Sequence, residues 1–340
     1  MKAVRFHQHG PPDVLLYEDA PDPSPASGRA LVRVRACALN HLDLWQRRGL
    51  ERVRIPLPHI SGSDVSGEIV DAGGALAPGT SVLLQPGLSC GACRACDAGR
   101  DNLCASYDVL GFMSDGGYAE LVSVPLQNIV PIPPHVDFIH AAAFPLTFLT
   151  AWHMLLTLAN LRAGDIVLVL AGGSGVGQAA IQIAREHGAR VFATAGPAKF
   201  ERTRSLGAEA VFDHYAVDFA QELRLATGGR GADIVVEHVG EATWDRSVRA
   251  LARGGRLVTC GATTGARATL DLRHLFARQL SFLGSYMGAK AELAAAAELF
   301  FAGRLRPVVD GVFPLSAAAD AHRRLESRQH FGKIVLTPDR

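Results

Sequence analysis

The clearest pattern in the sequence is a series of short apolar runs that alternate with helical segments in its second half. Amphipathic segments separate the runs, and one of them, 178–188, closes on a glycine. Fully apolar strands that alternate with helices are typical of βαβ units, in which helices cover both faces of the sheet. We therefore predict a doubly wound parallel α/β sheet, with strands near 165–172, 190–196, 210–214, 232–240, 255–261 and 280–285.

The first part of the chain has a different texture. It is rich in β-branched residues, and strands are predicted at 30–39, 66–73 and 80–87. A helical apolar pattern begins after Asp137 and continues toward Leu158. A last strand at 332–338 lies too far along to belong to the parallel series, so we expect it to return to the first domain. This predicts a β-rich domain formed by 1–147 and 287–340, and a parallel α/β domain at 148–286.

Composition narrows the possible partners. The 340 residues are 48% hydrophobic and 20% charged, with a formal net charge of +1. Such a balance argues against nucleic acid or an anionic membrane as the main partner. No apolar stretch approaches the roughly 20 residues that cross a bilayer, and the N-terminus lacks the apolar region of a signal peptide. We expect a cytoplasmic protein that acts on a small molecule.

The first apolar strand of the series leads into a glycine-rich turn that opens a helix. In this context the glycines allow a pyrophosphate to approach the backbone at the positive helix N-terminus. A tight turn without a ligand is the alternative interpretation. The predicted phosphate-binding residues are Gly172, Gly173, Ser174, Gly175, Val176 and Gly177.

The segment that follows bears on the choice of dinucleotide. An NAD site usually has an acidic residue about 20 residues beyond the glycines, where it binds the ribose 2′-hydroxyl. Here that place is 193–197, which contains Thr194 but no acid, and Lys199 and Arg202 follow. A segment that has nearby cations and no acidic residue favours a ribose 2′-phosphate over a 2′-hydroxyl, so we predict NADP(H). Solvated cations on a helix face are the alternative.

Four of the six cysteines are clustered with regular spacing in a lobe at 88–104, which predicts one zinc ion bound by Cys90, Cys93, Cys96 and Cys104. Four thiolates complete a tetrahedron and leave no open position, so we interpret this zinc as structural. In a reducing compartment clustered cysteines favour metal over disulfides. Unmetallated thiols are the alternative, and the two isolated residues, Cys37 and Cys260, are expected to be buried thiols.

Taken together, these features resemble the medium-chain dehydrogenase/reductase superfamily, which combines a GroES-like catalytic domain with a Rossmann domain. Zinc alcohol dehydrogenases of that superfamily have the four-cysteine lobe and a second, catalytic zinc. The residues at the three catalytic ligand positions here are Asn40, Ser63 and Leu146. Asn and Ser are poor zinc ligands, and Leu cannot bind metal.

These substitutions resemble the quinone oxidoreductase and enoyl reductase branch without catalytic zinc. That branch has A-L-N-x-x-D and G-x-D, which match Ala38 to Asp43 and Gly62 to Asp64, although it usually lacks the cysteine lobe. The resemblance implies NADPH-dependent hydride transfer to quinones or α,β-unsaturated carbonyl and enoyl substrates. The candidate catalytic residues are Asn40, Asp43, Ser63, Asp64 and Thr147.

Further cofactor contacts follow from the resemblance and from the carboxyl ends of the predicted strands, where ligands bind in open α/β sheets. Together with Thr194 and Lys199, the candidates are Tyr215, Cys260, Gly261, Ser285 and Lys333. The resemblance also implies a homodimer.

Two other functions remain open at this stage. One is a zinc alcohol dehydrogenase with a rebuilt catalytic site, for which Cys37, His41, His59 and Asp64 are metal-capable. The other is a non-catalytic NADPH-binding protein.

Overall fold

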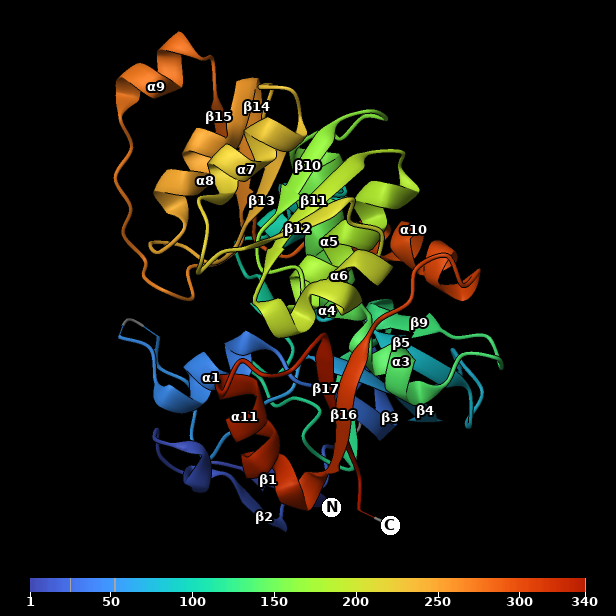
Figure 1. The fold of residues 1–340 in the computed structure, drawn as a ribbon. Helices are drawn as coiled ribbons and strands as arrows, with labels where there is room; N and C mark the ends of the chain where they lie inside the picture. The colour runs from blue at the N-terminus through green and yellow to red at the C-terminus, as the bar shows by residue number, and fades with distance from the viewer. Residues whose placement is uncertain (25, 52, 340) are drawn as a thin grey trace. The chain divides into compact units, whose positions relative to one another are not determined.

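The computed structural model describes residues 1–24, 26–51 and 53–339, and the chain divides into two compact units. The first unit is formed by Met1–Leu146 and Ala289–Arg340, and the second by Thr147–Gly288. The sequence predicts a division into 1–147 with 287–340, and 148–286. Figure 1 shows the elements of both units, coloured from blue at the N-terminus to red at the C-terminus.

The first unit is built on a seven-stranded, mostly antiparallel sheet. Its strand order is β16-β17-β3-β4-β5-β9, and β8 pairs with β3 beside this path. The strands are β3 (Arg29–Ala38), β4 (Asp64–Asp71), β5 (Ser81–Leu84), β8 (Leu121–Pro125), β9 (Ile129–Pro131), β16 (Val309–Pro314) and β17 (Lys333–Thr337). Two small hairpins, β1 (Lys2–Arg5) with β2 (Leu16–Asp19) and β6 (Gly87–Leu88) with β7 (Asp108–Val109), accompany it. The described helices are α1 (His41–Arg48), α2 (Arg94–Asp97), α3 (Phe138–Ala143), α10 (Lys290–Phe301) and α11 (Ala318–Glu326).

The register of this sheet determines which residues meet near its centre. Ala38 of β3 pairs with Asp64 of β4 on one side and with Val335 of β17 on the other. Since the β3–β17 pairing is antiparallel, continuing its register by two residues places Lys333 opposite Asn40. β17 is therefore the returning strand that the sequence predicts, and it joins the first unit beside β3.

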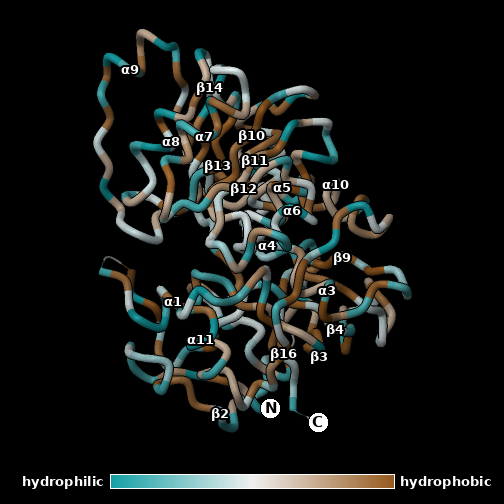
Figure 2. The backbone as a smooth tube through the Cα atoms, viewed as in Figure 1, coloured by the Kyte–Doolittle hydropathy of each residue, from teal (hydrophilic) through white to brown (hydrophobic). Residues whose placement is uncertain are grey.

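The second unit contains a six-stranded parallel sheet of order β12-β11-β10-β13-β14-β15. In chain order the strands are β10 (Ile166–Val169), β11 (Arg190–Ala195), β12 (Ala210–Asp213), β13 (Ala232–Glu237), β14 (Leu251–Thr259) and β15 (Ser281–Gly284). This is the 3-2-1-4-5-6 order of a doubly wound nucleotide-binding sheet. The central strands are mostly brown in Figure 2, as expected for strands buried on both faces. The prediction of fold class is confirmed.

Helices separate the parallel strands, as the alternating pattern predicts. They are α5 (Gly175–Glu186), α6 (Phe200–Ser205), α7 (Phe219–Ala226), α8 (Trp244–Ala250) and α9 (Leu272–Ala277). Each unit has its own core: Phe6, Val34 and Leu84 belong to the first core, and Leu168 and Val235 to the second.

The helical segment after Asp137 differs from the prediction of one continuous helix. The Asp137 carboxylate caps α3 by accepting a hydrogen bond from His140 N–H, but α3 ends at Ala143. A second helix, α4, runs over Pro145–Trp152, and a π-helical turn follows over His153–Leu158. Proline has no N–H to continue the preceding helix, and its ring clashes with the turn before it, so the chain breaks at Pro145.

Within the described parts of the chain, no helix is both long and apolar enough to cross a membrane.

Candidate functional site

The first candidate site is a buried carboxylate, Asp64, on which three separate segments converge. Its Oδ1 accepts a hydrogen bond from the backbone N–H of Leu146 at 2.7 Å. Its Oδ2 accepts one from Asn40 Nδ2 at 2.9 Å and lies 2.8 Å from the Lys333 ammonium. The sequence predicts that Asn40, the Ser63–Asp64 pair and Leu146 occupy the catalytic ligand positions of zinc alcohol dehydrogenases, and these residues meet here around the Asp64 carboxylate.

The Lys333 ammonium lies inside this group. Its Nζ donates to Asn40 Oδ1 at 2.6 Å and to Asp64 Oδ2 at 2.8 Å, and the side chain is 2% exposed. The sequence suggested Lys333 as a cofactor contact; the structure places it between Asn40 and Asp64. Since a buried ammonium is strongly unfavourable without an anionic partner, the pair with Asp64 is what allows this charge to be buried.

Asp43 lies one turn into α1, also fully buried. Its Oδ2 accepts hydrogen bonds from Asn40 N–H at 2.8 Å and from the Tyr118 hydroxyl at 2.9 Å. Burial raises the pKa of the Asp43 carboxyl to about 6, although these two hydrogen bonds and the charge of Lys333 favour the ionised form. Asp43 is thus bonded to backbone and to a neighbouring side chain, which holds the start of α1.

The hydrogen bonds of Tyr118 have a fixed direction. Arg47 can only donate, so His322 Nδ1 accepts from Arg47 at 3.1 Å and His322 Nε2 carries the proton that faces the Tyr118 oxygen at 3.3 Å. Tyr118 in turn donates to Asp43. Burial, followed by the Arg47 charge, lowers the pKa of His322 to about 3, so this imidazole is neutral near pH 7. The sequence suggests Tyr118 only as a residue that shapes the pocket and does not identify His322, because nothing near either residue indicates these hydrogen bonds.

Two hydroxyls from the predicted catalytic set are buried in their own units. Ser63 Oγ and Thr147 Oγ1 have no hydrogen-bond partner among the described residues. Ser63 is fully buried and Thr147 is 3% exposed. A buried hydroxyl normally finds a partner, so either group could bond to a ligand.

The alternative metal site proposed from the sequence is not assembled. Within residues 1–24, 26–51 and 53–339, the lobe cysteines are the only group of three or more His, Cys, Asp or Glu side chains close enough to share an ion. His59 Nε2 instead bonds to Gly111 O at 3.0 Å. The Cys37 thiol is fully buried, which raises its pKa well above the usual value. In the part of the chain that the structure describes, neither His59 nor Cys37 belongs to such a group.

In the second unit, the glycine-rich turn leads from β10 into the N-terminus of α5. Ser174 caps this helix by accepting a hydrogen bond from Gly177 N–H at 2.9 Å. A Cβ on Gly177 would lie 2.3 Å from the Ala171 carbonyl oxygen, so only glycine fits there. Helix α5 is long enough to present free N–H groups and a positive end to an anion. The turn also contains Gly172, Gly173, Gly175 and Val176.

His238 supports this turn from the end of β13 and was not foreseen. Its Nε2 lies 2.8 Å from the Leu170 carbonyl oxygen and 3.4 Å from Ser174 Oγ. A carbonyl can only accept, so Nε2 carries a proton. Burial lowers the pKa of His238, which favours the neutral ring. The position of His238 directly after a parallel strand is the signal that could have identified it.

The remaining predicted cofactor residues lie near the carboxyl ends of the parallel strands. Thr194 is in β11, and its Oγ1 accepts from Ala171 N–H at 3.0 Å, which ties β11 to the glycine turn. Tyr215 follows β12 and is 78% exposed. Its ring lies 3.7 Å from where a Cβ on Gly196 would be. Because all six strands are parallel, these ends share one edge of the sheet, together with Lys199, Cys260, Gly261 and Ser285.

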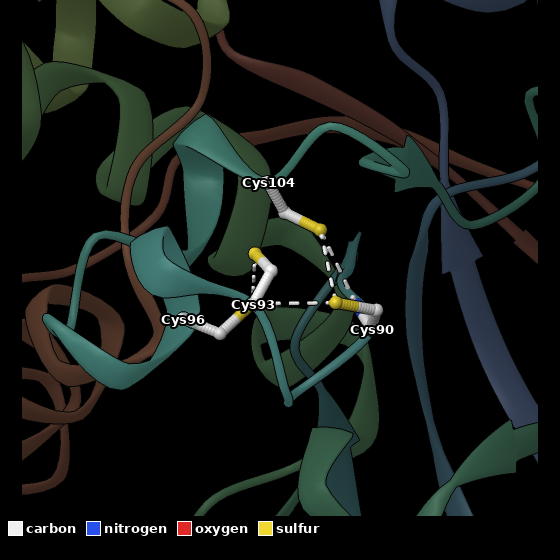
Figure 3. A group of neighbouring side chains, drawn as sticks. All are labelled: Cys90, Cys93, Cys96 and Cys104. Carbon is white, nitrogen blue, oxygen red and sulfur yellow. Dashed lines mark hydrogen bonds between the residues drawn. The ribbon is translucent and has the colours of Figure 1, made fainter.

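The four lobe cysteines point toward one another in Figure 3. Their sulfur atoms all lie within 4.8 Å of each other. Cys90 Sγ is 3.5 Å from Cys104 Sγ and 3.9 Å from Cys96 Sγ, and Cys93 Sγ is 3.5 Å from Cys96 Sγ. Tetrahedral zinc with Zn–S bonds of ~2.3 Å requires sulfur separations of about 3.8 Å. The four thiols therefore fit a closed zinc site.

Lys290, the first residue of α10, attaches this lobe to the rest of the first unit. Its Nζ donates to Ser89 Oγ at 2.6 Å and to Asp101 Oδ2 at 3.3 Å, and its backbone N–H donates to Asp101 Oδ1 at 3.0 Å. Asp101 belongs to the lobe and is 8% exposed. The lobe is thus anchored at a helix N-terminus, where a carboxylate is favourable.

Comparison with known proteins identifies the relatives of this architecture. The family described as "Alcohol dehydrogenase GroES-like domain" matches residues 26–134, and "Zinc-binding dehydrogenase" matches residues 175–302. A quinone oxidoreductase from Pongo abelii is 30% identical over 99% of this chain and 97% of its own. The chain belongs to the medium-chain dehydrogenase/reductase superfamily.

Relatives within this superfamily also include alcohol dehydrogenases. An NAD-dependent alcohol dehydrogenase from Sulfolobus acidocaldarius is 31% identical over 99% of both chains. A solved structure titled as an NAD-dependent alcohol dehydrogenase is 47% identical with a TM-score of 0.97, over 100% of both chains. The protein is therefore an oxidoreductase of this superfamily.

Proposed function

We propose that this medium-chain dehydrogenase/reductase transfers hydride from NADPH to quinones or to α,β-unsaturated carbonyl and enoyl substrates. The strongest support comes from Asp64 and the residues bonded to it, Asn40, Leu146 and Lys333, which we call the Asp64 cluster. At the three positions where the sequence predicts the catalytic ligands of zinc-dependent relatives, this chain has the Asn40 amide, the Ser63 hydroxyl and Leu146, whose backbone N–H donates to Asp64. Asn40 and Ser63 are poor zinc ligands, and the Asp64 carboxylate is already paired with Lys333.

The chemistry suits these groups. Oxidation of an alcohol requires loss of the hydroxyl proton, which a catalytic metal assists by lowering its pKa. An electron-poor C=C bond accepts hydride directly, and the negative charge moves to a carbonyl oxygen that hydrogen-bond donors can stabilise. In this proposal Asn40 donates an amide N–H to that oxygen, and the Ser63 and Thr147 hydroxyls are available to the substrate. The Asp43 carboxylate maintains the position of Asn40 by accepting a hydrogen bond from the Asn40 backbone N–H.

The cofactor proposed is NADP(H). The segment after β11 has no acid up to Lys199, and Glu201 pairs with Arg204 at 3.3 Å. Lys199 and Arg202 are the first two cations after β11, and we propose that they contact the 2′-phosphate. The double substitution K199A/R202A is expected to raise the KM for NADPH at least about tenfold while leaving that for NADH within about twofold. R204A is the matched control, because Arg204 lies on the same helix and pairs with Glu201.

We also propose one structural zinc ion in the four-cysteine lobe. The sulfur separations and the closed set of four thiol donors support it, and such a site stabilises a lobe without an open coordination position. The zinc ion would be held by Cys90, Cys93, Cys96 and Cys104. We further expect a homodimer through the edge strand β15, whose outer backbone groups are open to pairing, in a reducing cytoplasm. Sedimentation analysis checks the dimer.

The function is tested by following NADPH oxidation against quinones, enones, enoyl thioesters and aldehydes, each with and without a chelator. We expect oxidation with the first three classes that a chelator does not abolish. Tight NADPH binding without turnover of any class would favour a non-catalytic role instead.

A second candidate is an NAD-dependent alcohol dehydrogenase, which the names of two relatives favour. NAD⁺-dependent alcohol oxidation, abolished by chelation and accompanied by two zinc ions per chain, would establish this function in place of the first.

A further inference from the structure

Lys333 and Asn40 form a pair whose geometry has a consequence for the reaction. The side-chain oxygen and nitrogen of an asparagine are nearly alike in shape, so only hydrogen-bond partners define its orientation. An ammonium can only donate, so the Asn40 atom 2.6 Å from Lys333 Nζ must be the oxygen. The amide nitrogen then faces Asp64 Oδ2 at 2.9 Å, which can only accept when ionised. Lys333 and Asp64 together permit one orientation of this amide.

That orientation leaves one amide N–H of Asn40 available. The nitrogen carries two hydrogens, and within the described chain Asp64 is the one partner the structure gives it. Asn40 is 6% exposed, so the amide is held in a nearly dry setting where a donor is more effective than in water.

The cation also lies where three segments meet. Asp64 accepts from the Leu146 N–H and from Asn40, and its Oδ2 lies 2.8 Å from the ammonium. The sequence predicts that Asn40, Ser63–Asp64 and Leu146 correspond to the catalytic ligand positions of zinc-dependent relatives. The positive charge at this junction is thus supplied by strand β17 of the chain itself.

We propose that Lys333 is a positioning residue that acts through Asn40: its ammonium, paired with Asp64, fixes the amide so that an N–H faces the substrate carbonyl oxygen. This inference rests on the proposed function, because it requires a substrate oxygen that gains negative charge. Asn40 is the group that touches the substrate, and Lys333 determines how it does so.

The test is a double-mutant cycle on NADPH-dependent enone reduction. K333M/D64N removes both charges, so no unpaired ion is left in the core. In that variant the amide introduced at position 64 can donate to Asn40, which allows the Asn40 amide to turn over and present its oxygen instead. We expect kcat to fall about 100-fold in N40A and in K333M/D64N, as for removal of one oxyanion donor, with the KM for NADPH within twofold.

The decisive value is the further decrease in kcat when N40A is added to the K333M/D64N variant. If Lys333 acts through Asn40, N40A costs less than about threefold there, because the orientation is already lost. If Lys333 has a purely structural role, the decreases in kcat caused by N40A and by K333M/D64N should multiply, to about 10⁴-fold. K2M, the same substitution at an exposed lysine paired with Asp19, should leave kcat unchanged.

The outcomes separate this inference from the function on which it rests. A wild-type enzyme that reduces enones with multiplicative losses would overturn the role of Lys333 alone, as would full activity of K333M/D64N. A wild-type chain that oxidises no NADPH with any acceptor would overturn the proposed function and this inference together.

Discussion

The first unit gathers polar side chains at two places, and it does so in opposite ways. The cysteine lobe brings together four like donors from one short stretch, with Cys90 and Cys104 only 14 residues apart. The Asp64 cluster brings together unlike groups from distant strands, with Lys333 and Asp64 separated by 269 residues. The lobe presents donors that fit a metal cation, whereas the Asp64 cluster contains a cation of its own.

In the proposed function, one fold keeps a metal in the lobe and dispenses with it at the Asp64 cluster. The lobe is anchored through Lys290 and Asp101, so a change there alters a local module. The Asp64 cluster is part of the central sheet, where the register of β3, β4 and β17 creates the juxtaposition. Substitutions in the two regions should therefore have different effects on metal content, stability and turnover.

The largest effect is expected in the lobe. C104S removes one of four zinc ligands, so we expect zinc to be lost and the free energy of unfolding to fall by about 5 kcal/mol or more, since structural zinc contributes roughly 10 kcal/mol or more in isolated modules. Metal analysis and urea unfolding measure both. C260S should keep its zinc, because Cys260 lies outside the lobe. A C104S protein as stable as the wild type would show that the lobe needs no metal.

The next effect distinguishes a paired charge from an unpaired one. K333M leaves Asp64 buried without its cation and is expected to lower the free energy of unfolding by about 3–5 kcal/mol. K333M/D64N removes both charges and should recover most of that loss. Thermal and urea unfolding of both variants, with K2M as the exposed control, measure the difference. Equal destabilisation of the single and double variants would contradict the ion pair.

A pH-dependent effect should arise from Asp43, whose folded pKa of about 6 lies above its unfolded value of about 3.9. The folded state then binds more protons than the unfolded state, so this group makes the protein less stable as pH rises from about 4 to 6. D43N should remove that component, which amounts to about 3 kcal/mol. The measurement is the difference in unfolding free energy between D43N and wild type across pH 4–7. A constant difference would show that the Asp43 pKa is not raised.

The smallest effect is expected for Ser63. Its hydroxyl has no partner among the described residues, so S63A should change the free energy of unfolding by less than about 1 kcal/mol. If the hydroxyl bonds to substrate, kcat/KM for enones falls by about threefold to tenfold. Unfolding measurements and steady-state kinetics on the same preparation separate the effect of S63A on stability from its effect on turnover. A large loss of stability would mean that Ser63 has a structural role.

Local patterns made much of the fold predictable. The apolar strands alternating with helices predicted the parallel sheet, and the cysteine spacing predicted a group of converging thiols. Both signals could be read because each is contained in a short stretch of sequence. The break at Pro145 was missed because the apolar pattern continues through it. The glycine turn was foreseen, but its support by His238 was not, since that contact spans 68 residues.

The Asp64 cluster was predictable only in part. Family motifs indicated Asn40, Asp43, Ser63 and Asp64, but they suggested a cofactor contact for Lys333. The register of β17 against β3 is what places Lys333 opposite Asn40, and strand register is not visible in one sequence. The contact between Tyr118 and His322 was not predicted for the same reason, because it joins residues 204 positions apart.

The central claim is that the chain keeps zinc in the lobe and performs its chemistry without a catalytic metal. Metal analysis of the purified protein, combined with NADPH-dependent enone reduction on the same sample, tests it most directly. We predict one zinc ion per chain, and turnover that persists when a chelator removes loosely bound metal. Two zinc ions per chain, with activity that disappears when the second is removed, would contradict the account.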